Sequence, residues 1–176
     1  MTDAGLLIAR VFLGMAMAAH GSQKAFGWFG GHGLKGTAGF FEKLGYKPGV
    51  LFAALAAYVE IFGGLLTALG LFGPAGPALI LLVMIVAAGT IHIQNGFFAS
   101  KNGFELNALY IAGALALTFG GLGALSLDDV FGLGRFFNGT TNATAIAVGA
   151  AIGLITLSIR RSAESDGPHT ASRTGA

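Results

Sequence analysis

The sequence contains no cysteine, and only 10% of its 176 residues are charged. Without cysteine the chain cannot form a disulfide, a thiolate metal site or a dithiol redox centre, so any redox role needs a bound cofactor. The scarcity of charge, together with a hydrophobic content of 54%, excludes an ordinary water-soluble domain. The composition therefore predicts an integral membrane protein.

Five apolar segments are each long enough to cross a bilayer. At 1.5 Å per residue each is roughly 25 to 33 Å long, which matches a hydrocarbon core of about 30 Å. The segments run from about Leu6 to Phe26, Val50 to Leu71, Pro77 to Phe98, Leu106 to Leu122 and Ala143 to Ile159. We expect an all-α, polytopic transmembrane helix bundle, in which the 30 glycines let the helices pack closely.

The connections between these segments divide the chain into four parts. Residues 1–125 would form a four-helix membrane bundle, and residues 126–142 a long outer loop with scattered polar residues. Residues 143–160 would form an additional transmembrane helix. Residues 161–176 consist largely of small, polar and charged residues, so this tail is expected to be disordered.

Lysine and arginine are distributed unequally between the two sides that five crossings create. One side would carry Lys24, Lys35, Lys43, Lys47, Lys101, Arg160, Arg161 and Arg173, and the other only Arg10 and Arg135. Positive residues concentrate on the cytoplasmic side of membrane proteins. The pattern predicts an inner (plasma) membrane protein with its N-terminus outside and its C-terminus in the cytoplasm. Because the positive residues are explained by the orientation in the membrane, no nucleic-acid partner is expected.

Glu60 is the least expected residue in the chain, because it lies at the middle of the second span. A charge at that depth costs roughly 2.5 to 3.5 kcal/mol, so such residues usually face the bundle interior and pair. Residues that tolerate close helix packing surround it at helical spacing, namely Ala53, Ala56, Ala57, Gly63, Gly64 and Thr67. Glu60 is therefore predicted to lie in a helix–helix contact.

Arg10 on the first span is the expected partner of Glu60. The pair would either clamp two helices together or contribute to a substrate or quinone site. In a third interpretation Arg10 extends toward the headgroups and does not pair. An interior stripe at intervals of three or four residues contains Arg10, Gly14, Met17, Gly21 and Lys24.

A group of polar residues falls at the predicted inner ends of three spans. The group consists of His20, Gln23, Lys24, His92, Asn95 and Glu105. These residues are either ordinary helix-end polar groups or a site in which a histidine exchanges protons. No metal site is predicted, because the histidines lack an HxxH or HExxH spacing. The candidate catalytic residues are His20, His92 and Glu60, and the candidate cofactor-binding residues are Arg10, Lys24, Gln23, Asn95 and Glu105.

Three sequence blocks resemble the DoxX family of small bacterial membrane proteins. They are "LLIARVFLGMAMAAHGSQKAFGWFGGHGLKGTAGFFEKLGYKP", "VEIFGGLLTALGLF" and "HIQNGFFASKNGFELN", and the resemblance covers about residues 5 to 125. It implies a bundle of four DoxX-like helices, to which this chain adds the outer loop and a fifth span. The residues that match the family motifs are Arg10, His20, Gly21, Lys24, Glu60, Gly63, Gly64, His92, Gly96, Phe97 and Glu105.

The resemblance implies a redox association more clearly than a reaction. The family is similar to the DoxD subunit of thiosulfate:quinone oxidoreductases, and some members are linked to redox-stress complexes with soluble partner enzymes. Three functions follow as hypotheses. The protein is a quinone-linked or oxidative-stress redox subunit, a non-catalytic scaffold that recruits soluble redox enzymes through Lys35, Glu42, Lys43 and Lys47, or a small-solute or proton transporter. A transporter would need a homo-oligomer to build a pore.

Overall fold

The computed structural model describes residues 2–160, and every regular element in that part of the chain is helical. Short turns of 3-10 or π helix follow α1, α4 and α6. The α-helices are α1 (Asp3–Phe26), α2 (Gly33–Lys43), α3 (Gly49–Leu69), α4 (Ala75–Ala87), α5 (Glu105–Gly120), α6 (Leu127–Val130) and α7 (Gly139–Ser158). The prediction of an all-α helical bundle is confirmed.

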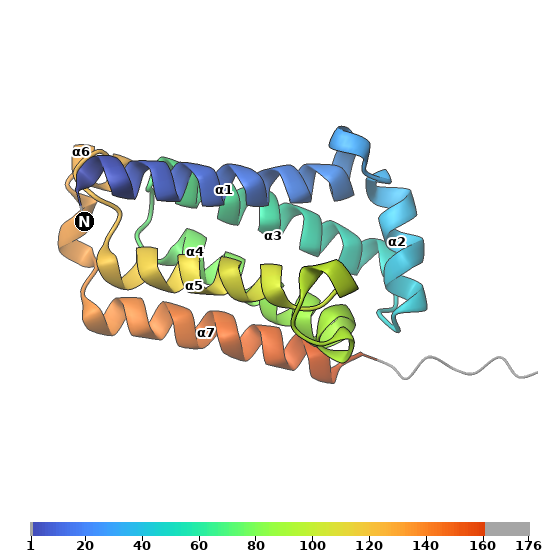
Figure 1. Cartoon of the computed structure of the whole chain (residues 1–176). Helices are drawn as coiled ribbons and strands as arrows, with labels where there is room; N and C mark the ends of the chain where they lie inside the picture. Colours follow the sequence, from blue (N-terminus) through green and yellow to red (C-terminus); the bar gives the residue numbers. More distant parts are fainter. Residues whose placement is uncertain (1, 161–176) are drawn as a thin grey trace, which may run out of the picture.

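Five helices run back and forth along one direction, and α2 lies across one end of them (Figure 1). Four of the five are long and apolar enough to cross a membrane: α1, α3, α7, and α4 together with the turns that continue it to Asn95. The remaining helix, α5, is apolar but has 16 residues, about 24 Å at 1.5 Å per residue. All five predicted segments are therefore helices, and the fourth is shorter than predicted.

The helical path changes at the end of α4. After Ala87 the chain forms a π-helical turn over Ala88–His92 and then a 3-10 turn over Ile93–Asn95. The prediction of one continuous span to Phe98 is therefore wrong in its last turn. π-Helical turns are rare and occur frequently at functional sites.

Helix α2 forms between the first two predicted segments, where the sequence predicted no helix. Its segment GLKGTAGFFEK contains three glycines and is short, so its intrinsic helix propensity is low. Contacts with its neighbours stabilise it. The Thr37 hydroxyl donates to the Lys24 carbonyl at 3.3 Å, and the Glu42 carboxylate accepts from the Gly49 N–H at 3.2 Å, which caps α3. The scaffold hypothesis used Glu42 as a docking residue, but its carboxylate is engaged within the fold.

The predicted outer loop 126–142 contains secondary structure. The short helix α6 starts with the Ser126 hydroxyl accepting from the Asp129 N–H, and a 3-10 turn follows at Leu133–Phe136. Helix α7 begins at Gly139, four residues before the predicted boundary at Ala143, because Asn138 and Thr141 form a reciprocal capping box. The tail predicted to be disordered, residues 161–176, lies outside the described residues.

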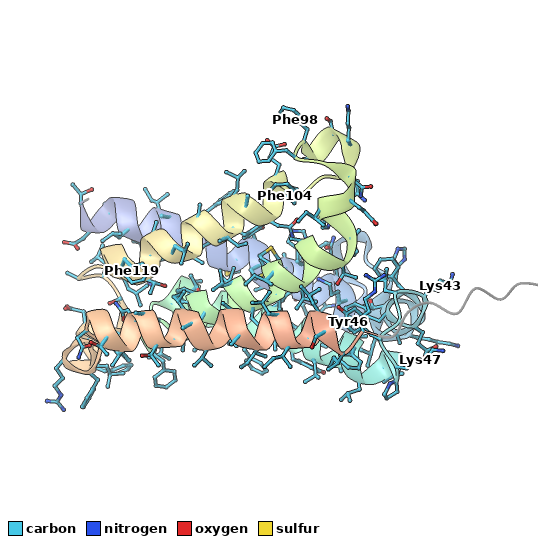
Figure 2. All side chains as sticks on the ribbon, turned by 90° about the horizontal axis from the view of Figure 1, so that it is seen from below. Lys43, Tyr46, Lys47, Phe98, Phe104 and Phe119 are labelled. Carbon is cyan, nitrogen blue, oxygen red and sulfur yellow. The ribbon has the colours of Figure 1, made fainter. Side chains whose placement is uncertain are left out.

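The core of the bundle is small and the outside is apolar. The central buried cluster consists of Met17, Ile80, Val83, Met84 and Ala114. Large apolar side chains face outward along the helices, with Phe12 78% and Leu154 60% exposed. Figure 2 shows Lys43 and Lys47 at one end of the bundle and Phe119 toward the other. Apolar flanks with cationic groups at an end are the surface that a bilayer requires, so the protein is a multi-pass membrane protein.

Candidate functional site

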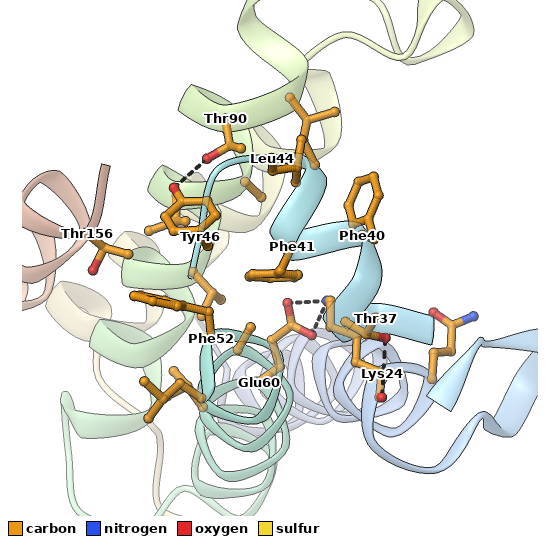
Figure 3. Close-up of a pocket in the computed structure, with 18 of the residues that line it drawn as sticks. Lys24, Thr37, Phe40, Phe41, Leu44, Tyr46, Phe52, Glu60, Thr90 and Thr156 are labelled. Atoms are coloured by element: carbon orange, nitrogen blue, oxygen red, sulfur yellow. Dashed lines mark hydrogen bonds and ion pairs between the residues drawn. The ribbon is translucent and has the colours of Figure 1, made fainter. Parts of the chain in front are cut away.

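A cavity of about 560 Å³ lies at the end of the bundle that α2 covers (Figure 3). Every helix except α5 and α6, together with the segments flanking α2 and the π turn after α4, contributes to its wall. Most of the lining is apolar, including Phe41, Phe52 and Val83. Two further lining side chains, Leu55 of α3 and Ile152 of α7, are 52% and 45% exposed, so the cavity is not an enclosed void.

A part-buried ion pair forms one polar end of this cavity. The Lys24 ammonium from α1 donates to both carboxylate oxygens of Glu60 from α3, with the bond to Oε1 at 2.6 Å. The Lys24 side chain is 30% exposed and that of Glu60 only 5%. Figure 3 shows the pair below Phe41, at the side of the cavity that α1 and α2 form. Lys24 is therefore paired inside the bundle, in the place that the sequence interpretation gave to Arg10.

Close packing of α1 against α3 brings Lys24 to Glu60. Gly14 packs on the backbone of Gly64 and Ala68, and Gly21 packs on that of Ala57 and Ile61, so an added methyl group at either glycine would overlap the partner helix. These two contacts fix the register of the antiparallel helices. In this register the last turn of α1 lies beside the middle of α3, which confirms that Glu60 lies in a helix–helix contact.

The prediction that Arg10 pairs with Glu60 is wrong. Arg10 lies about 21 Å along α1 from Lys24, at 1.5 Å per residue, and is 2% exposed. Its Nη1 donates to the Ala68 carbonyl at 2.7 Å, and its Nη2 donates to the Leu125 carbonyl. Arg10 is not part of the cavity wall. It ties the C-terminal end of α3 to the loop before α6.

The six polar residues predicted to converge at the inner end are divided among different contacts. Gln23, Lys24 and His92 line the cavity, whereas His20, Asn95 and Glu105 do not. His20 is exposed, 3.2 Å from Gln23 through its Nδ1, with its ring edge-on to Tyr110.

Asn95 and Glu105 organise the loop that follows α4. The Asn95 amide donates to the carbonyls of Ile91 and Asn102, and the Glu105 carboxylate accepts from the Ala99 N–H at 2.8 Å. The Asn102 carbonyl also lies 2.9 Å from His92 Nδ1. A carbonyl only accepts, so Nδ1 of His92 is the donor in this contact, and in the neutral imidazole Nε2 is left as an acceptor.

Sequence reasoning missed the second polar end of the cavity. The Tyr46 hydroxyl lies 2.9 Å from the Thr90 hydroxyl, and both residues are buried. Tyr46 follows the unpredicted helix α2, and Thr90 lies in the unpredicted π turn. Helical periodicity in the sequence therefore identified neither residue as part of a site. Thr156 of α7 also lines the cavity, and its hydroxyl is bonded to the Ile152 carbonyl at 2.8 Å.

The described residues contain no group of three or more His, Cys, Asp or Glu side chains placed to hold a metal ion. His20 and Glu105, two of the three residues with ligand-type side chains at the inner end, are engaged in separate contacts. The chemistry that the cavity offers is hydrogen bonding and proton exchange by Lys24, Glu60 and His92 beside an aromatic wall.

Comparison with known proteins identifies a family. The model of the family described as DoxX matches residues 5–93, which span α1 to the π turn after α4. No curated protein and no solved structure matches the chain. The matched segment contains both members of the Lys24–Glu60 pair and both members of the Tyr46–Thr90 pair, whereas α5 and α7 lie beyond it.

Proposed function

The chain belongs to the DoxX family, and from this membership and the cavity we propose that it is a quinone-binding membrane subunit of a redox system whose electrons come from soluble partner enzymes. A quinone, when bound, takes up two electrons and two protons to become a quinol. The chain has no cysteine and supplies no thiol redox centre of its own. Its residues therefore bind, orient and exchange protons.

The observation that carries this proposal is the cavity with Lys24 and Glu60 at its end. Its volume of about 560 Å³ suits a small organic ring, since such sites typically measure roughly 300 to 1,000 Å³. An apolar wall with aromatic rings and a few polar groups is also the usual lining of such sites. The half-exposed Leu55 and Ile152 indicate a side opening through which an apolar tail would reach the lipid.

The ion pair leaves one donor for a ligand. An ammonium has three N–H groups, and Lys24 directs bonds to both oxygens of Glu60, which leaves the third for a quinone carbonyl oxygen. Glu60 keeps the ammonium in place beside the apolar wall, where an unpaired charge would be costly. His92 Nε2 supplies a second group that can exchange a proton from the cavity wall.

The proposal also includes a membrane and an orientation. The end of the bundle with the cavity also carries Lys43 and Lys47 (Figure 2), and the distribution of positive residues supports a cytoplasmic location for that end. Soluble enzymes would then reach the cavity end of an inner (plasma) membrane protein. We assign the N-terminus to the outside and the C-terminus to the cytoplasm.

The test is the quinone content of the detergent-purified protein, measured by solvent extraction and mass spectrometry. We expect near-stoichiometric quinone in the unaltered protein and a loss of at least about tenfold in Lys24→Met, which removes the donor and leaves Glu60 unpaired. Glu60→Gln should insert normally and also retain less quinone. His20→Ala is the matched control, because His20 is a nearby polar residue outside the cavity wall.

Two outcomes would contradict the proposal. The first is an absence of quinone from a folded protein that co-purifies with a soluble enzyme. That result would favour the scaffold function, for which the exposed Lys35, Lys43 and Lys47 offer a docking surface. The second is equal loss of quinone in His20→Ala and Lys24→Met. That result would show that the cavity is not the quinone-binding site.

A further inference from the structure

The cavity has a second polar end, formed by Tyr46 and Thr90. Tyr46 lies between α2 and α3 and is 2% exposed, and Thr90 lies in the π turn after α4 and is 5% exposed. Their hydroxyl oxygens are 2.9 Å apart. Figure 3 shows this pair on the opposite side of Phe41 from Lys24 and Glu60.

This pair has one hydroxyl proton more than its mutual bond uses. Two hydroxyls carry two protons, and one proton forms the bond between them. The other threonines that line the cavity bond to backbone carbonyls, Thr37 to Lys24 and Thr156 to Ile152. Within the described residues, the recorded hydrogen bonds of the Tyr46 and Thr90 hydroxyls are only with each other. A buried hydroxyl proton without a partner is unfavourable, so this pair is prepared to donate to an occupant.

The wall between the two polar ends is apolar and aromatic. The Tyr46 ring packs on Phe41 with centroids 5.7 Å apart and on Phe52 with centroids 5.2 Å apart. Both phenylalanines line the cavity. The wall therefore presents the Lys24 donor at one end, an aromatic surface in between, and the Tyr46–Thr90 donor at the other end.

We infer that the Tyr46–Thr90 pair is the second hydrogen-bond donor of the site and binds the quinone carbonyl opposite the one that Lys24 binds. This inference rests on the proposed function. Hydrogen-bond acceptors at both ends of a flat ring match the arrangement, so the site selects 1,4-quinones over rings with one carbonyl. Tyr46 and Thr90 are then specificity-determining residues.

The test compares the affinity of two probes for the full chain in detergent micelles by titration calorimetry. One probe is a short-tailed 1,4-benzoquinone, and the other is the matching ring with a single carbonyl, a cyclohexenone. We expect the unaltered protein to prefer the quinone by about tenfold, the effect of one buried hydrogen bond. The double variant Tyr46→Phe/Thr90→Val should lose this preference. Each single variant keeps one hydroxyl that can donate, so it should keep most of the preference for the quinone.

Thr156→Val is the matched control. It removes a hydroxyl from the same cavity, but that hydroxyl is already bonded to the Ile152 carbonyl, so the preference should remain. A purely structural role of Tyr46 and Thr90 would lower stability without changing the ratio of the two affinities. The ratio therefore separates the two roles.

A second measurement needs no variant. Infrared spectra of the bound benzoquinone, with each carbonyl carbon labelled in turn by ¹³C, should show both carbonyl stretches shifted down by hydrogen bonding. One unshifted carbonyl, or an unchanged preference in the double variant, would overturn the inference and leave quinone binding intact. A failure of the unaltered protein to bind either probe would overturn the proposed function as well.

Discussion

At the scale of single residues, Arg10 is a buried cation whose partners are carbonyl groups. The last carbonyls of a helix lack partners within the helix and carry its partial negative charge. Ala68 is the second-to-last residue of α3, and its carbonyl accepts from Arg10 Nη1 at 2.7 Å. The guanidinium thus caps α3 and at the same time holds the Leu125 carbonyl of the loop before α6. Its role is to connect three segments at the end opposite the cavity.

We predict that Arg10→Leu lowers the free energy of unfolding by about 3 kcal/mol, because it removes two charge-assisted hydrogen bonds, one buried and one part-buried. Unfolding in mixed micelles titrated with dodecyl sulfate and followed by circular dichroism measures this change. Arg135→Leu is the control, since Arg135 is exposed and lies over the Phe136 ring. Its effect should be below about 1 kcal/mol.

The same variant also separates two roles for Arg10. Because Arg10 lies outside the cavity wall, the folded fraction of Arg10→Leu should keep its quinone. Loss of quinone without loss of stability would show that Arg10 belongs to the binding site after all.

The interior stripe on α1 shows what could and could not be predicted for individual residues. Helical spacing alone placed both Arg10 and Lys24 on one interior stripe of α1, and it placed Glu60 in a helix–helix contact. The choice between the two cations depends on how far α1 is shifted along α3. That shift is determined by the packing of Gly14 on Gly64 and of Gly21 on Ala57, and a single sequence does not say which glycines meet.

At the scale of elements, α7 is attached to the bundle by glycine contacts. Gly149 packs on the Ala78 carbonyl and Gly153 packs on Ile85, and both glycines are buried. Arg160 Nε, just beyond α7, donates to the Leu44 carbonyl after α2 at 2.6 Å. These contacts position Ile152 and Thr156 in the cavity wall.

We predict that Gly149→Leu displaces α7 from α4 and lowers quinone content severalfold, because the cavity loses one wall. Overpacking of this kind typically costs about 1–3 kcal/mol, so the thermal midpoint should fall as well. Extraction with mass spectrometry and a thermal melt give the two values. Ala151→Leu is the matched control on the exposed face of the same helix and should change neither. Full quinone retention in a destabilised Gly149→Leu protein would show that α7 does not bound the site.

The elements that the sequence did not reveal are those that tertiary contacts stabilise. The five apolar helices have long hydrophobic runs, and such runs identify helices without further information. Helix α2 has few of the features of an independent helix, and it forms because Thr37 and Glu42 bond to α1 and α3. The π turn at Ala88–His92 is a local change within an apolar run and leaves no periodic signal. Tyr46 and Thr90 were missed for this reason.

At the scale of the whole molecule, the family match covers only part of what forms the cavity. Residues 5–93 supply both polar ends, whereas α7, which supplies Ile152 and Thr156, lies outside the match. The polar chemistry of the site thus belongs to the family segment, and part of the side wall belongs to the C-terminal helix. Replacing Ile152 is therefore expected to change which quinone tails or ring substituents the cavity accepts. It should have less effect on how the quinone carbonyls are bound.

Orientation in the membrane decides which compartment the cavity end faces, and the charges of the whole molecule determine it. We predict that single cysteines replacing Lys43 and Lys101 react with a membrane-impermeant maleimide only in inside-out vesicles. A cysteine replacing Arg135 should react in intact cells, because it lies at the opposite end. The chain has no cysteine of its own, so every label reports the introduced position. Labelling of the Lys43 position in intact cells, with the Arg135 position protected, would reverse the topology. The cavity end would then face the outside, and a soluble cytoplasmic electron donor would have no access to it.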